Sequence, residues 1–153
     1  MSTPGFLTVI DDTPEATLAL RFAARRARAV GGTLHILAPL PPLDPVAWAD
    51  VAATIDAEER AEAEESARLA AQALSAEHGV TPTISVARGE PIEMVRELAL
   101  ADPTITTLVL ATAASGAPGP LVSAFTGVDA GLLPIPVLIV PGGLSDVDID
   151  RLS

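Results

Sequence analysis

Apolar and polar positions follow two patterns along the chain. Short runs of apolar and β-branched residues predict five strands, at Phe6–Ile10, Thr33–Ala38, Thr83–Ala87, Thr106–Ala111 and Val137–Val140. Longer segments with apolar residues every three or four positions predict helices, one running to about Val30 and others over Glu58–Glu77, Ile92–Leu100 and part of Leu121–Leu133. Strands that alternate with helices predict an α/β fold, in which one parallel sheet carries helices on both faces.

The first helix has the clearest predicted boundaries. Thr13 suits an N-cap, and Pro14 suits the first helical position. Glu15 lies in the first turn, where the helix dipole favours an acid. Gly31-Gly32 ends the helix, because glycine readily adopts the left-handed conformation that follows a last helical turn.

Two stretches do not follow these patterns. Pro45–Ile55 is predicted to form a loose helical turn that carries Trp48. Trp48 and Met94 are expected to be packing residues, Trp48 in the core or at an interface.

Residues 1–141 are predicted to form a single domain. Residues 142–153 are polar and acidic, and we expect them to form a fraying tail.

Composition narrows the classes of function. The net charge is −11, and the nine cationic side chains include no lysine, which excludes a Walker-type phosphate lysine and Schiff-base chemistry. This acidity disfavours nucleic acid as a partner. The absence of cysteine excludes disulfides and thiolate sites. No apolar run approaches the roughly 18 residues that cross a membrane, and the first residues read as a strand rather than a signal peptide. We therefore expect a cytoplasmic domain without a membrane partner.

No cluster of catalytic or metal-binding residues is visible in the sequence. A whole strand-helix unit separates His35 from His78, and neither lies in a set of ligands at metal-binding spacing. Ser115 and Ser123 have no neighbouring base. The DVDID segment at residues 146–150 lacks the glycine and the closing acid of an EF-hand. The sequence therefore predicts neither a catalytic residue nor a metal site.

The loop after the fourth predicted strand is the best candidate for a binding site. Residues 112–120, TAASGAPGP, are almost all small or turn-forming. In an open α/β sheet, a loop of small residues between a strand and the next helix is where backbone N–H groups hold a phosphate. A phosphate is therefore the group to test at this loop.

Three segments carry a resemblance to a known family. VIDDTPEATLALRFAARRARAVGGTLHIL, ARGEPIEMVRELALADPTITTLVLAT and PIPVLIVPGG follow one another in this order over nearly the whole chain. Together they resemble the universal stress protein family, in its first strand and helix, its third strand to fourth strand, and its last strand. The resemblance implies a flavodoxin-like three-layer sandwich, similar to adenine nucleotide alpha hydrolases, with strand order 3-2-1-4-5. It also implies a homodimer through Val137–Val140, an apolar edge strand that invites pairing.

The nucleotide-binding branch of that family has a glycine motif at the end of strand four. The motif is Gly-x2-Gly, nine residues and then Gly-Ser or Gly-Thr. In one register, Ala111 and Ala114 stand at the first two glycines. Ser123 and Ala124 then stand at the last pair, one residue short of the family spacing. Each alanine methyl interferes with close approach of the backbone to a phosphate.

A second register is also open. Gly116 and Gly119 then supply the first two glycines, but Gly127-Val128 follows after seven residues and lacks the hydroxyl. Neither register restores the motif, and the loop contains no cation. We therefore expect no tightly bound ATP.

Two further positions match the family. Asp11 matches an acid after strand one that lies near adenine and ribose, or it is a turn acid that supports Thr13. Pro39 matches a position that lines the adenine site, or it stops the second strand.

The resemblance leads to two hypotheses on function. The first is a non-enzymatic homodimer with a stress-response or regulatory role, which acts through unidentified protein partners and has no cofactor. The alternative is a family member that binds ATP or AMP over strands one and four. An electron-transfer protein of flavodoxin-like fold is disfavoured, because DDTPE at residues 11–15 is too acidic for the FMN phosphate.

Overall fold

The computed structural model describes residues 3–11, 13–43 and 48–153. Its sheet has five parallel strands, β1 (Gly5–Val9), β2 (Thr33–Leu40), β3 (Thr83–Arg88), β4 (Ile105–Ala111) and β5 (Val137–Val140). Their order is β3-β2-β1-β4-β5, which confirms the predicted fold and topology. The helices of the described residues are α1 (Glu15–Val30), α2 (Ala49–His78), α3 (Pro91–Ala101), α4 (Pro120–Phe125), the 3-10 helix η1 (Val128–Leu132) and α5 (Asp146–Leu152).

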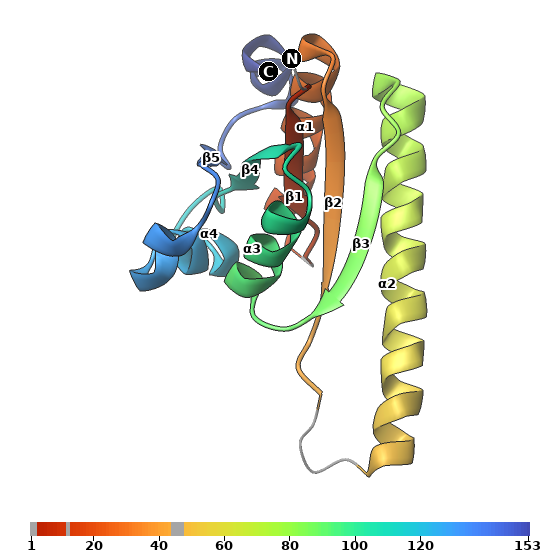
Figure 1. The fold of residues 1–153 in the computed structure, drawn as a ribbon. Coiled ribbons are helices and arrows are strands. Elements are labelled where there is room, and N and C mark those ends of the chain that lie inside the picture. The colour runs from red at the N-terminus through yellow and green to blue at the C-terminus, as the bar shows by residue number, and fades with distance from the viewer. Residues whose placement is uncertain (1–2, 12, 44–47) are drawn as a thin grey trace.

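Helices cover both faces of the sheet (Figure 1). On one face α1, α5 and the C-terminal half of α2 pack on alternate strand residues such as Phe6, Ile36 and Val109. On the other face α3 and α4 pack on the intervening residues, among them Leu7 and Leu108. The alternation of strand side chains between faces places both apolar layers inside the molecule. None of the helices in the described ranges is long and apolar enough to cross a membrane.

The helix α2 is longer than predicted. It begins at Ala49 rather than Glu58 and has 30 residues. No glycine or proline interrupts Ala49–His78, and alanine and glutamate, both good helix formers, dominate it. The first residues of the predicted turn, 45–47, lie outside the described residues. Trp48 precedes α2 and is 83% exposed, so its expected packing within the chain is wrong, whereas Met94 is buried as expected.

The expectation of a fraying tail at residues 142–153 is also wrong. Ser145 caps α5 by accepting a hydrogen bond from the Asp148 N–H at 3.2 Å. Ile149 is fully buried in the core against α1. Arg21 in α1 donates two hydrogen bonds to the Asp150 carboxylate, at 2.9 and 2.8 Å, and holds the pKa of that carboxyl below its usual range. The segment is ordered because it has one apolar anchor and one bidentate ion pair.

The helix predicted over part of Leu121–Leu133 is interrupted. α4 ends at Phe125, and η1 begins at Val128 after a break at Thr126-Gly127. The Thr126 hydroxyl donates to the carbonyl of Val122 at 2.7 Å, a local bond that competes with continuation of the helix. Phe125 nevertheless remains buried, so the short helix still covers its face of the sheet.

Candidate nucleotide-binding site

The carboxyl ends of β1 and β4 meet at the N-terminal ends of α1 and α4. This arrangement brings three of the predicted residues together, because Asp11, Ala111 and Gly119 line one small cavity. The side chains of Thr13 and Glu15, from the start of α1, line the same cavity. It lies at the point in the sheet where α/β proteins commonly bind ligands.

The small cavity is nearly filled by the protein itself. Its volume is about 10 Å³, roughly enough for one water molecule. A Cβ added at Gly119 would lie 3.0 Å from Glu15 Oε1, so the carboxylate of Glu15 lies against the start of α4. An anionic side chain therefore lies next to the loop that was predicted to hold a phosphate, a group that favours backbone N–H donors and positive charge.

The two glycines of the second register have backbone conformations that favour glycine. Gly116 has φ 76° and Gly119 has φ 106°, both in the region that L side chains rarely adopt. The loop they belong to is closed by a hydrogen bond from the Ala113 N–H to the Pro118 carbonyl, at 2.9 Å. These glycines shape a turn, and one N–H of the loop is already used within it.

The residues of the first register lie in different environments. Ala111 is buried at the end of β4 and pairs with Val140 of β5. Ala114 is exposed in the loop, whereas Ser123 and Ala124 lie inside α4. The Ser123 N–H donates to the Gly119 carbonyl at 3.1 Å. The N–H of Ser123 is therefore used within α4.

The environment of Asp11 matches a turn acid. Its Oδ1 accepts a hydrogen bond from the Thr13 N–H, at 3.1 Å, and another from the Thr13 hydroxyl. The predicted N-cap role of Thr13 is wrong, because α1 begins at Glu15, its N-cap position is Pro14, and no cap bond comes from a side chain of the described residues. The carboxylate two residues earlier binds the hydroxyl that would otherwise cap the helix.

A larger hollow lies beside the small cavity, and Asp11 lines both. It has a volume of about 620 Å³, within the range of small-molecule sites. Pro39 and neighbouring residues of β2 form an apolar wall, and the acids around it are Asp11, Glu59, Glu62 and Glu90. No lysine or arginine is among the described residues that line this hollow.

Pro39 does not stop β2, which continues to Leu40. The Leu37 carbonyl accepts a hydrogen bond from the Ile10 N–H at 2.9 Å, on the side of β1. Backbone groups alternate sides along a strand, so the nitrogen of Pro39 also faces that side, where β1 has already ended. Proline has no N–H to donate on that side, and β2 continues along β3, where Pro39 pairs with Ala87.

Arg88 at the end of β3 was not among the predicted site residues. Its Nη2 lies 2.9 Å from Asp56 Oδ1 and 2.7 Å from Glu59 Oε2, and its Nη1 donates to the Pro41 carbonyl. Arg60 and Arg88 together hold the pKa of Asp56 below its usual range. Arg88 thus ties α2 to the residues after β2, across a separation that no local sequence pattern signals.

Gly142, after β5, was also missed. Its N–H donates to the Thr112 hydroxyl at 2.9 Å, so it lies directly on the loop that follows β4. A Cβ at this position would lie 2.0 Å from the Thr112 carbonyl oxygen. Glycine is required here by the close approach of two backbones.

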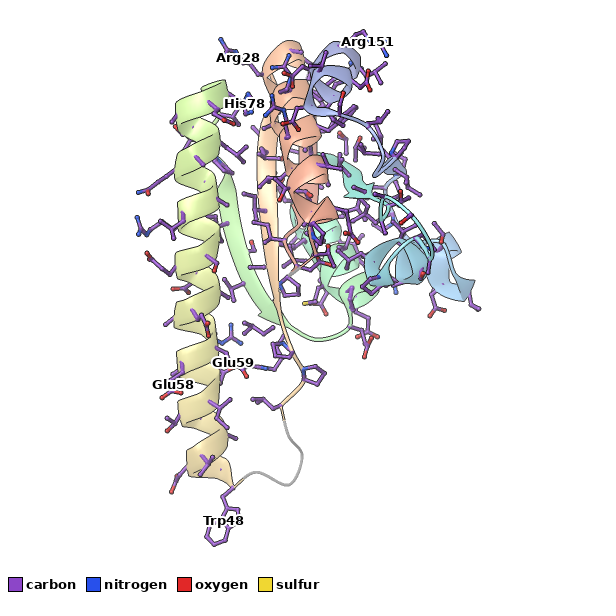
Figure 2. The ribbon with its side chains drawn as sticks, turned by 180° about the vertical axis from the view of Figure 1, so that it is seen from behind. Arg28, Trp48, Glu58, Glu59, His78 and Arg151 are labelled. Atoms are coloured by element: carbon purple, nitrogen blue, oxygen red, sulfur yellow. The ribbon has the colours of Figure 1, made fainter. Side chains whose placement is uncertain are left out.

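Neither histidine is among the residues that line the two cavities. His35 Nε2 is 3.8 Å from Asp102 Oδ2, and His78 Nε2 is 3.3 Å from Glu77 Oε2. Figure 2 shows His78 near Arg28 at the C-terminal end of α2. Within residues 3–11, 13–43 and 48–153, no group of three His, Cys, Asp or Glu side chains is placed to hold a metal ion.

Several solved structures have the same fold. Universal stress protein UspA from Lactobacillus plantarum superposes with a TM-score of 0.72 at 19% identity, covering 92% of this chain and 99% of that one. A universal stress protein from Archaeoglobus fulgidus in complex with dAMP gives 0.63 at 18% identity, covering 91% and 98%. Another, in complex with cAMP, gives 0.53 at 19% identity, covering 92% and 98%. At these identities the likeness concerns the fold alone.

Comparison at the level of sequence decides the family. A search of curated proteins found no match. The family model described as the universal stress protein family matches residues 6–141, which span all five strands. The chain therefore belongs to the universal stress protein family.

Proposed function

We propose that this protein is a non-enzymatic universal stress protein that acts as a cytoplasmic homodimer through contacts with other proteins, without binding ATP tightly. The observation that carries the proposal is the small cavity between β1, β4 and α4, which the Glu15 carboxylate and the loop before Gly119 nearly fill. A stress-response or regulatory role would then depend on the surfaces with which it contacts other proteins.

Charge supports the same proposal. Residues 111–124 contain no cation, and the whole chain has a net charge of −11. A triphosphate entering this region would meet the carboxylates of Glu15 and Asp11, with backbone N–H groups already engaged at Ala113 and Ser123. Magnesium would offset only part of that repulsion.

The alternative is a family member that binds an adenine nucleotide. The hollow of about 620 Å³ favours it, because the hollow adjoins Asp11 and Pro39, the two positions that match the family's adenine site. The complexes of related universal stress proteins with dAMP and cAMP favour it too. A base in the hollow would still require its phosphates to displace Glu15.

Mass spectrometry separates these two functions. We expect the purified protein, after release of bound molecules by heat or acid, to contain no stoichiometric adenine nucleotide. We also expect millimolar Mg·ATP to leave its thermal midpoint unchanged, since the phosphate position is filled. A copurified nucleotide would contradict the proposal, as would stabilisation approaching the roughly 2.7 kcal/mol that a ligand gives at one hundred times its Kd.

The edge strand β5 provides the test of the dimer. Among the described residues β5 pairs with β4 alone, and Ile139 is 38% exposed. We expect wild-type protein to have a dimer mass in light scattering and Ile139→Lys to be monomeric, because two such lysines would oppose each other across paired edges. Val30→Lys, a similarly exposed β-branched residue in α1, is the matched control and should remain dimeric. A monomeric wild type, or a dimeric Ile139→Lys that is folded by circular dichroism, would refute this interface.

A further inference from the structure

The N-terminal part of α2, residues Ala49–Glu65, extends beyond the sheet, and we call it the α2 arm. In Figure 1 the helix continues well past the end of β3, and Figure 2 shows Trp48 at its far tip. The buried residues of α2, which are Ala67, Leu74 and His78, all lie beyond the arm. A helix of 30 residues is about 45 Å long, so a substantial length of α2 contributes little to the core.

The arm has a strong negative charge that is only partly compensated. It contains seven carboxylates and one arginine. Asp56 and Glu59 face the body of the protein and pair with Arg88. Figure 2 shows Glu58 directed away from the body, on the opposite side of the helix from Glu59. The arm therefore presents different acids to the protein and to the surroundings.

Glu58 and Glu62 form an exposed pair of acids on the arm. Both are exposed, and among the described residues neither has a cation within 4.0 Å. They stand four positions apart on one helix face, where like charges destabilise the helix by a few tenths of a kcal/mol. A cation from outside the chain would relieve that repulsion.

Exposed apolar residues flank this pair along the same face. Val51 and Leu69, which are 52% and 53% exposed, lie seven positions before Glu58 and seven after Glu62. That spacing returns to one face of a helix. Trp48, the single tryptophan of the chain, adds a large aromatic surface at the tip. Aromatic residues of this kind are common energetic anchors of protein interfaces.

The hollow beside Asp11 continues this acidic surface. Glu62 lines the hollow together with Glu59 and Ser66 of α2, and Glu90 faces them from the start of α3. The hollow of about 620 Å³ has room for side chains of a docked segment. The arm and the hollow thus combine apolar contact area with negative charge and available volume.

The negative charge of the α2 arm indicates the chemical class of its partner. The arm of a second copy carries the same negative charge and would be repelled by this arm. Nucleic acids and anionic membranes have the wrong sign. No group of three metal-ligating side chains is found in the part of the chain that the structure describes. A basic protein segment has the complementary charge.

We propose that the α2 arm, with the adjoining hollow, binds an arginine- or lysine-rich amphipathic segment of a partner protein. Basic side chains of the segment pair with Glu58 and Glu62 and enter the hollow, while its apolar side chains contact Val51 and Trp48. The inference rests on the proposed function, in which the protein acts through protein contacts. It adds the surface and the chemical class of the partner.

A peptide titration tests the surface. The probe is a fluorescently labelled peptide of about fifteen residues, with arginine and leucine alternating at helical spacing, measured by anisotropy near physiological salt. The double variant Glu58→Gln/Glu62→Gln should weaken its binding by about fivefold or more, the effect expected for two partly exposed charge pairs. Trp48 emission in the wild type should shift on binding, since the indole leaves water.

The matched control removes the same charge elsewhere. Glu93 and Glu97 are also exposed and four positions apart, on α3. Glu93→Gln/Glu97→Gln should weaken binding by less than about twofold, as should be the case when two distant surface charges are removed. Equal weakening by both double variants, or no binding of the peptide to wild-type protein, would overturn the proposal.

The outcome is independent of the nucleotide and dimer measurements. If a nucleotide copurifies while the two double variants differ as expected, the proposed function fails and the docking surface stands. If no nucleotide is found and both variants bind equally, the docking surface fails alone. A further variant, Trp48→Ala, should weaken peptide binding without changing the thermal midpoint, because Trp48 is 83% exposed.

Discussion

Replacement of Gly142 by alanine is expected to lower the free energy of unfolding by about 2–3 kcal/mol, near the upper range for overpacking a tight site. The added methyl would lie 2.0 Å from the Thr112 carbonyl oxygen and 2.8 Å from the Ala114 nitrogen. Both neighbours are backbone atoms, so no side chain can rotate away. The segment after β5 or the loop after β4 must move.

Thermal or urea unfolding measures this loss. For a domain of this size, a change of 2–3 kcal/mol lowers the midpoint by roughly 5–10 °C. Gly143→Ala is the matched control, because a Cβ at Gly143 has no neighbour within 4 Å. Its midpoint should stay close to that of the wild type. If both variants unfold together with the wild type, the close approach of these two backbones is not present in solution.

Ile149→Ala should cost about 2–4 kcal/mol, the usual range for truncation of a buried isoleucine. Ile149 is fully buried and packs in the core beside α1. Its loss removes the apolar anchor of α5 and leaves the ion pair between Arg21 and Asp150 to hold the helix. That pair is partly exposed, and partly exposed pairs contribute little.

Val147→Ala is the control for this effect. Val147 lies in the same helix, is 77% exposed, and should change the free energy of unfolding by less than about 0.5 kcal/mol. Chemical denaturation of the two variants gives the comparison directly. Equal stabilities for Ile149→Ala and Val147→Ala would show that α5 does not dock on α1.

The edge strand β5 lies at the predicted residues Val137–Val140, although only Val140 in it is buried. β4 begins one residue before the prediction, and it is mostly buried, as are β1 and β2. In such strands the apolar run itself marks the element, whatever surrounds it. The strand order followed from the family resemblance, and the structure has the same order.

The start of α2 and the helix α5 could not be predicted, because both depend on contacts between distant parts of the chain. The inner face of the α2 arm carries Asp56, Glu59 and Arg60, because it packs on Arg88 rather than on the apolar core. The residues before Glu58 therefore have no apolar stripe that would predict a helix. α5 has a single buried apolar residue, Ile149. Arg21, which pairs with Asp150 of α5, lies near the other end of the sequence.

The candidate site was also predicted in part, in those features that depend on local sequence. The sequence located the loop after β4 and the acid after β1, and the structure places Asp11, Ala111 and Gly119 around one cavity. The approach of Glu15 to Gly119 joins residues from α1 and the start of α4. Such a contact depends on how two helices pack, and local patterns contain no signal of it.

The position of Glu15 has a thermodynamic consequence. A protein that binds ATP only when folded gains stability as the ATP concentration rises, and it loses that stability when cellular energy falls. Here the Glu15 carboxylate lies against Gly119, next to the loop predicted to hold a phosphate, and it is part of the chain itself. If the protein has the proposed function, its folded fraction is then determined by the chain itself and does not depend on the ATP concentration. Such a protein would persist unchanged through starvation, when a nucleotide-stabilised relative would begin to unfold.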